Sequence, residues 1–308
     1  MRQKQELHSE LLTLLSAAIS GLFPIIVSHT IKTFPPILFA GLSNLIPGLI
    51  AFLYIIFTKQ NLNFFNKRSL KHLISIVIFI IVLPSFCIFL GAKYTSSINL
   101  AILLQTELLF TFIICGLFFK EKITLKNVLG AILIAIGTIT VLYNGAFTLN
   151  KGDILIIIGT ALYPIGNNSS KKALQFIPIS FIVFFRGIFG GSILILISFL
   201  MEKTYLNLIP SIQNHLLPIL INGILIFTIA KTISFYGLKY LDITRVIPLL
   251  CSAVGFSLIF AFLFLKEIPT FYQILGLIFI VSGIFVITKK IFFQTEFNLK
   301  KVEIKSKK

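Results

Sequence analysis

The sequence predicts an all-α integral membrane protein with ten transmembrane helices, arranged as two inverted five-helix repeats. Its composition is 57% hydrophobic and only 12% charged, which leaves too little polar surface for a soluble protein. Apolar runs recur along nearly the whole chain, each about 20 residues long, the length that crosses roughly 30 Å of hydrocarbon as a helix. The third observation is an internal repeat that relates residues 91–140 to residues 237–286 without a gap.

The repeat is defined by polar and glycine positions rather than by apolar letters alone. Each matched pair is separated by 146 positions, the distance from Gly91 to Gly237. The first copy contains Gly91, Lys93, Tyr94, Lys120-Glu121, Gly130 and Gly137, and the second contains Gly237, Lys239, Tyr240, Lys266-Glu267, Gly276 and Gly283. Because each half has an odd number of expected helices, the second half enters the membrane from the opposite face.

The expected helices follow the apolar runs in order. In the first half they cover about residues 8–31, 36–57, 73–92, 96–118 and 124–143. In the second half they cover about residues 153–172, 179–200, 216–237, 242–264 and 270–290. We therefore divide the chain into a first five-helix repeat (1–150), a second five-helix repeat (151–290) and a basic cytoplasmic tail (291–308).

The distribution of basic residues predicts the orientation. With both termini on one side, that side carries 19 of the 27 Lys and Arg residues in its loops and tail, and the other side carries five. Basic loops stay in the cytoplasm, so we expect both termini to be cytoplasmic in a bacterial inner membrane. The net charge of +17 is then a topology signal and a contact with anionic lipid headgroups, and no nucleic-acid partner is expected.

Inverted repeats favour transport as the function. Two similar halves of opposite orientation can exchange conformations around a site near the bilayer midplane. A membrane-embedded enzyme acting on a lipid or isoprenoid substrate is the alternative, and a passive channel comes third. The sequence lacks a phosphate-binding loop, a HExxH motif and a nucleophile elbow, and its four histidines are scattered, so we expect no enzymatic activity, cofactor or metal.

Glu107 is the main candidate for a substrate-binding residue. It falls in the middle of the expected helix 96–118, where a charge costs on the order of 3 kcal/mol on insertion scales. Its counterpart in the second repeat is Ala253, so the packing of the repeat does not require a carboxylate. The side chain either binds substrate, cation or proton, or forms a buried hydrogen bond with Gln105 or Thr106.

Basic residues inside the apolar segments are the next candidates. Arg186, Lys231 and Arg245 all lie toward the expected cytoplasmic side, where their long side chains can reach the headgroups. Alternatively they form a basic vestibule for an anionic or carboxylate-bearing solute. Together with Glu107, this mixture of charges suits a zwitterion such as an amino acid. Asn44 occupies the position in the first repeat that corresponds to Arg186.

Prolines mark the expected helices 8–31 and 153–172 at matching places. Pro24 and Pro164 each remove a backbone donor and predict a kink, so these two helices are expected to line the transport path. Nearby polar side chains, His29, Tyr163 and Asn167, are candidate lining residues. An interhelical hydrogen bond is the alternative for each of them.

Glycines and the two Lys-Glu pairs have a structural interpretation. Gly187 and Gly191 form a GxxxG pattern, typical of close helix packing within the fold or between chains. The repeated glycines, Gly130, Gly137, Gly276 and Gly283, are also expected to pack. Glu121 and Glu267 each precede the last helix of a repeat and are expected to favour the positive N-terminus of that helix.

These motifs resemble the EamA branch of the drug/metabolite transporter superfamily over about residues 8–290. The residues that carry the resemblance are Lys120-Glu121, Gly130 and Gly137, repeated as Lys266-Glu267, Gly276 and Gly283. The resemblance implies ten helices, cytoplasmic termini and secondary transport by alternating access. It also implies a central cavity lined by helices 1, 3, 4, 6, 8 and 9.

The resemblance also suggests a class of substrate. Members of this branch move amino acids, other metabolites, nucleotide sugars or drugs, often as exporters. The small four-helix multidrug relatives carry a Glu within helix 1, whereas helix 1 here has only Glu10 at its start. We expect a secondary active transporter of a small polar metabolite, an amino acid or a related organic solute. A proton or cation is the candidate coupling partner, and the chain is expected to be a monomer or homodimer in the lipid bilayer.

Overall fold

The computed structural model describes residues 2–60, 67–118, 125–143, 150–202, 212–234, 249–250 and 252–286. Within these ranges the chain is helical, with short turns and no strand. The predicted all-α class is therefore confirmed. The expected tail, residues 291–308, and the candidate Arg245 lie outside the described ranges.

The helices divide between the two halves of the chain. The first half contains α1 (Arg2–Ser20), α2 (Phe23–Thr30), α3 (Pro36–Phe57), α4 (Lys67–Ile76), η1 (Val77–Val82), α5 (Leu83–Ala92), α6 (Ser97–Leu103), α7 (Thr106–Phe118) and α8 (Leu125–Tyr143). The second half contains α9 (Lys151–Ala173), α10 (Ile179–Met201), α12 (Leu216–Leu220), η3 (Ile221–Ala230), α15 (Ala253–Phe260), η4 (Ala261–Leu265) and the helix Phe271–Val286.

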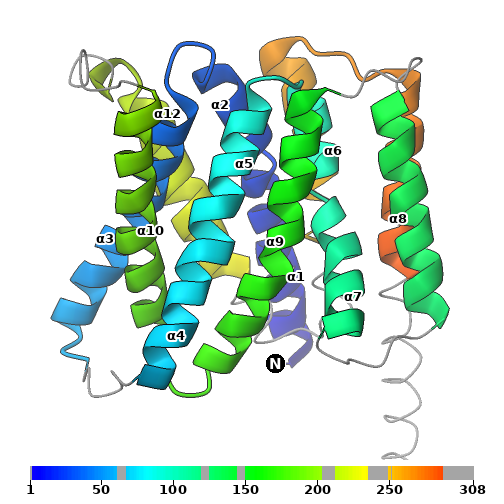
Figure 1. Ribbon diagram of the computed structural model, residues 1–308. Helices are drawn as coiled ribbons and strands as arrows, with labels where there is room; N and C mark the ends of the chain where they lie inside the picture. Colours follow the sequence, from blue (N-terminus) through cyan, green and yellow to red (C-terminus); the bar gives the residue numbers. More distant parts are fainter. Residues whose placement is uncertain are drawn as a thin grey trace, which may run out of the picture.

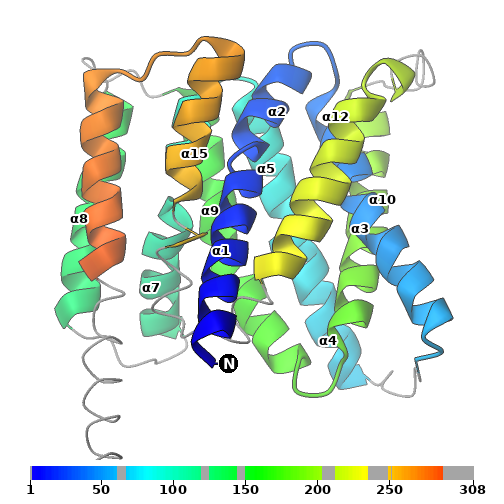
Figure 2. The same cartoon turned by 180° about the vertical axis from the view of Figure 1, so that it is seen from behind.

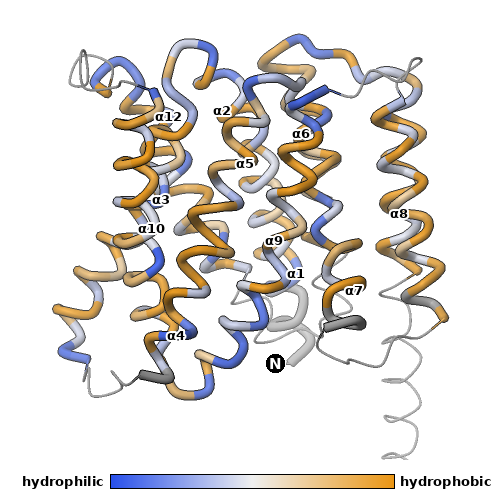
Figure 3. Tube along the Cα trace, viewed as in Figure 1, coloured by the Kyte–Doolittle hydropathy of each residue, from blue (hydrophilic) through white to orange (hydrophobic). Residues whose placement is uncertain are grey.

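The protein is a multi-pass membrane protein. Five of the described helices are long and apolar enough to cross a bilayer: His8–Thr30, Pro36–Phe57, Ser69–Ala92, Ile179–Met201 and Leu216–Ser234. Shorter apolar helices cover Ser97–Thr111, Val128–Tyr143, Ala253–Leu265 and Phe271–Val286. Hydrophobic residues follow the helices along their length, and hydrophilic residues gather at the turns at both ends of the molecule (Figure 3). The count of ten crossings stays a prediction.

The second half runs opposite to the first. In Figure 1, α1 rises from the N-terminus and its counterpart α9 descends. Similarly, α3 descends whereas α10 rises, and Figure 2 shows the same relation from behind. These directions agree with the inverted order predicted from the sequence.

Glycines hold α3 and α10 in close contact. A Cβ added at Gly187 would lie 2.6 Å from the Cα of Gly48, and one at Gly191 would lie 2.9 Å from the carbonyl oxygen of Gly41. Such distances require that no side chain stand between the two backbones. The GxxxG pattern is therefore used inside the fold.

A second glycine contact joins α8 to the helix Phe271–Val286, and it shows the symmetry of the repeat. A Cβ at Gly137 would lie 2.6 Å from the carbonyl oxygen of Gly276, and one at Gly283 would lie 2.6 Å from that of Gly130. Because Gly137 corresponds to Gly283 and Gly130 to Gly276, the repeat relation converts each contact into the other. A two-fold relation between antiparallel halves has this property.

The first expected helix, 8–31, is present as the span His8–Thr30, and a turn at Gly21 and Leu22, close to the kink predicted at Pro24, divides it into α1 and α2. Pro24 has no N–H, and its ring clashes with the carbonyl of residue i−4, which is Ser20. Accordingly α1 ends at Ser20, and α2 begins at Phe23. The hydroxyl of Ser257 in α15 lies 2.9 Å from two acceptors, the carbonyl oxygen of Gly21 and that of Ala253 in its own helix, so the second repeat supplies a donor at the interruption.

The expected helix 96–118 is also interrupted, between α6 and α7. The Thr106 hydroxyl donates to the carbonyl oxygen of Leu103 at 2.7 Å, a side-chain bond that competes with the helical pattern. The backbone N–H of Glu107 then donates to Leu104 at 3.3 Å, one residue short of the α-helical spacing. Leu104 and Gln105 form a turn, and a new helix starts at Thr106.

Wide π-helical turns occur at equivalent places in both repeats. η1 covers Val77–Val82, and the 146-residue repeat maps these positions onto residues 223–228, inside η3. η1 directly precedes Pro84, whose missing donor already disturbs the hydrogen-bond pattern there. The matched register indicates that the wide turns belong to the repeat itself.

Three hydrophobic cores organise the described residues, and two of them, a larger and a smaller one, include residues of α6. The larger core is built from α2, α3, α5, α9 and α10, with Leu100 and Leu103 of α6 packed into it. The smaller core is built from α8, α15 and the helix Phe271–Val286, with Ile98 and Ile102 of α6 packed into it. α6 therefore lies between the two cores.

Candidate functional site

A cluster of polar side chains lies among α7, α9, α10 and the end of η3. We call Glu107, Tyr163, Asn167, Arg186 and Lys231 the central polar cluster. The Asn167 side chain donates from Nδ2 to Oε1 of Glu107 at 3.1 Å. The partner of Glu107 is thus a residue of the opposite repeat, and the hydrogen bond joins the two halves.

The interruption before α7 places Glu107 at a helix N-terminus inside the membrane span. Glu107 lies in the first turn of α7, where the positive end of the helix dipole stabilises a carboxylate. Thr106 fixes this helix start, since its hydroxyl lies 2.7 Å from that of Thr160 in α9. The same turn therefore positions Glu107 and lowers the cost of its charge.

Lys231 follows directly after η3 and carries the charge opposite to Glu107. It is close enough for its charge to act on the Glu107 carboxylate and on Arg186. Its side chain is exposed in this chain, and its charge lies near that of Glu107.

Tyr163 and Arg186 complete the cluster from α9 and α10. Tyr163 interacts electrostatically with both Glu107 and Arg186. Tyr163 and Arg186 are partly exposed, whereas Asn167 is exposed. The cluster thus brings together one carboxylate, two basic groups and two neutral polar groups.

Other predicted residues lie apart from these interactions. Asn44 is 5% exposed and donates to the carbonyl oxygen of Ala40 at 2.9 Å, so its amide is engaged within α3. His29 is exposed in the last turn of α2. Gln105 lies in the turn that precedes Glu107.

The two prolines occupy different settings. Pro24 lies in the first turn of α2, directly after an interruption, whereas Pro164 lies inside α9, which is continuous. α9 has 23 residues, and its polar segment contains Asn167, Asn168, Ser169 and Ser170.

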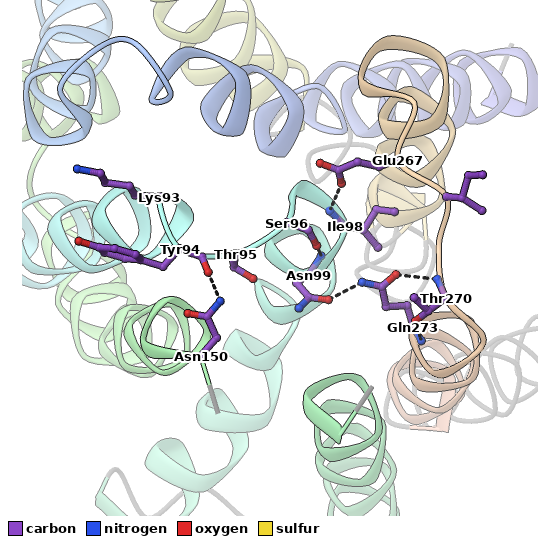
Figure 4. Close-up of a pocket in the computed structure, with 11 residues that line it drawn as sticks. Lys93, Tyr94, Thr95, Ser96, Ile98, Asn99, Asn150, Glu267, Thr270 and Gln273 are labelled. Carbon is purple, nitrogen blue, oxygen red and sulfur yellow. Dashed lines mark hydrogen bonds between the residues drawn. The ribbon is translucent and has the colours of Figure 1, made fainter. Parts of the chain in front are cut away.

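A second polar region was not predicted from the sequence. It is an open groove of about 590 Å³ at the end of the molecule opposite the N-terminus (Figure 4). It is lined by Lys93, Tyr94, Thr95, Ser96, Ile98, Asn99, Asn150, Glu267, Ile268, Thr270 and Gln273.

Glu267 bonds a different helix from the one expected. Its Oε2 accepts from the Ser97 hydroxyl at 2.5 Å and from the N–H of Ile98 at 3.4 Å, at the start of α6. The N-terminus of the helix that follows Glu267, Phe271–Val286, is capped instead by Thr270 and Gln273. The Thr270 N–H donates to Gln273 Oε1 at 2.9 Å, and the Gln273 N–H donates to the Thr270 hydroxyl at 3.3 Å. This is a capping box, and the spacing Thr-x-x-Gln is a signal that sequence reasoning missed.

Among the described residues, no group of three or more His, Cys, Asp or Glu side chains has the arrangement of a metal site. The polar residues of the central polar cluster are instead suited to binding a small solute through hydrogen bonds and opposite charges.

Comparison with known proteins identifies the family. A model of the EamA-like transporter family matches residues 8–143 and, a second time, residues 150–289. The chain belongs to the EamA-like transporter family. The two matches in an EamA-like chain correspond to two repeats, in agreement with the repeat read from its sequence.

Relatives of this EamA-like protein are named as transporters. A Bacillus subtilis protein named uncharacterized transporter YoaV is 23% identical over 265 residues, covering 84% of this chain and 89% of the relative. An uncharacterized transporter of Methanothermobacter thermautotrophicus is 24% identical, and that match spans 58% of the relative. One from Archaeoglobus fulgidus is 26% identical over 66% of this chain. A general transporter role follows from the family.

A solved structure supports the fold alone. It is described only as the crystal structure of a protein and matches with a TM-score of 0.65 at 16% identity. The match covers 91% of this chain and 96% of that chain.

Proposed function

We propose that this protein is a secondary active transporter of a small zwitterionic metabolite, an amino acid or a related organic solute. It works by alternating access in a bacterial inner membrane, with ten crossings and both termini in the cytoplasm. The central polar cluster is its substrate-binding site, with Glu107 facing the substrate ammonium and Lys231 and Arg186 facing its carboxylate.

The observation that carries this proposal is the set of opposite charges that the two repeats bring together. Glu107 bonds Asn167 through one carboxylate oxygen, and Lys231 acts on it electrostatically while remaining exposed. Opposite charges inside a membrane protein normally pair to offset the cost of burial. In the proposed site these charges instead face a ligand that carries both complementary charges.

The arrangement of the halves supports the mechanism. The bond between Asn167 and Glu107 joins the two repeats, which run in opposite directions. A site at the boundary between inverted repeats becomes accessible from either face when the repeats exchange their conformations. The interruption before α7 is the kind of discontinuous helix that builds midplane sites in such proteins.

Transport in proteoliposomes tests the function. Purified protein is assayed for uptake and efflux with a panel of metabolites, with and without a pH gradient. We expect a zwitterionic solute to accumulate, and dependence on the pH gradient identifies a coupling proton. Failure of every solute under every gradient refutes the proposed function.

The substitution Glu107→Gln tests the site. It keeps the size of the side chain but removes its charge, so transport of the zwitterion should be lost while expression and membrane insertion are kept. The matched control is Glu10→Gln, the same chemical change midway along α1 and outside the central polar cluster. Unchanged transport in Glu107→Gln would remove this residue from the binding site.

A further inference from the structure

The turn between α5 and α6, together with the first residues of α6, is bonded to two separate elements around the groove, the start of α9 and residues 267–273 (Figure 4). On one side, Thr95 donates to Asp153, and Asn150 donates to the carbonyl oxygen of Tyr94, so the turn is tied to the start of α9. Beside these bonds, a Cβ at Gly152 would meet the carbonyl oxygen of Gly91, which shows close backbone packing of α5 on α9. The backbone contact belongs to the larger core, which includes Ala92 of α5 and Ile156 of α9.

The attachment on the other side is made of side chains at the edge of the groove. Gln273 donates from Nε2 to Oδ1 of Asn99 at 2.7 Å, and Glu267 accepts from Ser97 and Ile98. We call these three hydrogen bonds the Glu267 clasp. They connect α6 of the first repeat to residues 267–273 of the second, and all of them are only partly buried. Water from the groove can therefore replace them one by one.

The backbone at both ends of the clasp departs from regular helix. Lys266 adopts a left-handed conformation with φ 56°, directly after the π-helical turn η4, and this turn directs Glu267 toward α6. On the other side, α6 ends at the Leu104–Gln105 turn before α7. α6 is thus a short helix that can change its position without carrying all of α7 with it.

α6 also connects the groove to the substrate-binding site. Ten residues separate Ser97 in the clasp from Glu107 in the central polar cluster, about 15 Å along a helix. α6 lies between the larger and the smaller hydrophobic cores, with side chains packed into each. A separation of α6 from the smaller core therefore opens a path from this face toward Glu107.

We propose that the Glu267 clasp is the gate that closes the transport path on the face opposite the N-terminus. When the substrate-binding site opens to this face, the clasp bonds exchange with water and residues 267–273 move away from α6. The bonds of the turn to α9 stay intact during this step. The proposal rests on the alternating-access function above, and it assigns the moving contact within that cycle.

Cross-linking and labelling test the gate without knowledge of the substrate. In a background with serine at Cys87, Cys115 and Cys251, the pair Asn99→Cys and Gln273→Cys forms a disulfide across the clasp. The substitution Asn167→Cys in the same chain reports access to the substrate-binding site. A membrane-impermeant maleimide is then added from either face of oriented vesicles, before oxidation, after oxidation and after reduction.

We expect oxidation to abolish labelling from the face opposite the N-terminus and to leave labelling from the N-terminal face. Reduction of the disulfide should restore labelling from the face opposite the N-terminus. The matched control is the pair Thr95→Cys and Asp153→Cys, which cross-links the turn to α9 and should leave labelling from both faces unchanged. Thermal stability and labelling of each reduced variant verify that it is folded.

Two results overturn the gate. Labelling from the far face that persists in the oxidised clasp variant shows that α6 and residues 267–273 need not separate. Labelling that is lost only in the Thr95 and Asp153 pair places the moving contact at α9 instead. The clasp disulfide can abolish labelling from the far face in a protein that transports no metabolite of the panel. That result supports the gate and counts against the proposed substrate.

Discussion

The contact between α3 and α10 predicts a large penalty for the smallest possible substitution, Gly187→Ala. The new Cβ would lie 2.6 Å from the Cα of Gly48 and 2.7 Å from its nitrogen, whereas ordinary contacts are 3.4–4 Å. These neighbours are backbone atoms, so the helices must separate by about 1 Å along their contact. Overpacking of this kind costs up to about 3 kcal/mol, and the higher helix propensity of Ala offsets about 1 kcal/mol of this cost. We expect a net loss of about 2 kcal/mol.

The matched control is Gly255→Ala in α15, because a Cβ at Gly255 has no neighbour within 4 Å. This variant should be at least as stable as the unmodified protein, since only the propensity gain remains. Thermal unfolding of both variants in the same detergent, monitored by size-exclusion chromatography, measures the difference in their stability. We expect Gly187→Ala to melt roughly 4 °C lower or more. Equal melting temperatures for the two variants would refute the packing argument.

Two further substitutions test particular polar groups in the same unfolding assay. Asn222 is 0% exposed in η3, and its Nδ2 and Oδ1 have no hydrogen-bond partner among the described residues, so Asn222→Leu should raise the stability by about 1–3 kcal/mol. A lower stability of this variant would show that water or a ligand holds the amide. Ser257→Ala removes the bond to the Gly21 carbonyl and should cost about 1–2 kcal/mol, whereas Ser257→Thr should retain the bond; an Ala variant as stable as the unmodified protein would contradict this role for the hydroxyl.

The scaffold was predictable because its signals are local in sequence and repeated. Apolar runs locate the helices, and Gly130, Gly137, Gly276 and Gly283 recur at a fixed spacing because the two helices that carry them approach each other at those points. The odd number of helices in each half then gives the opposite directions that the structure shows.

The interruptions were less predictable, since proline alone does not determine them. Pro24 and Pro164 occupy matching places, yet the helix breaks only before Pro24, where Ser257 supplies a donor to the freed carbonyl. The turn at Leu104 and Gln105 contains no proline and depends on Thr106 bonding backward and to Thr160. Such turns depend on partners from distant helices, which a single segment does not reveal.

The groove was missed for a related reason. Glu267 precedes a helix, so a reading along the chain assigns it to that helix, but Thr270 and Gln273 already satisfy the helix start. The Glu267 carboxylate therefore accepts its hydrogen bonds from the N-terminus of another helix, α6, which is distant in sequence but close in space. The capping-box spacing at Thr270 and Gln273 would have indicated that Glu267 was available for another partner.

The backbones of the two repeats are similar, whereas their polar side chains differ, and these two properties have different roles in the proposed transport. In the repeat register Glu107, in the first turn of α7, corresponds to Ala253, the first residue of α15, so α7 and α15 begin within one residue of each other. Only the first repeat puts a carboxylate there, and only the second puts a lysine, Lys231, where the first has Ser85. In the proposed transport cycle the symmetric backbone would let the two halves exchange conformations, and the unequal charges would distinguish the two ends of the proposed zwitterionic substrate. The substrate-binding residues of such a repeat protein are therefore to be sought where the two copies differ.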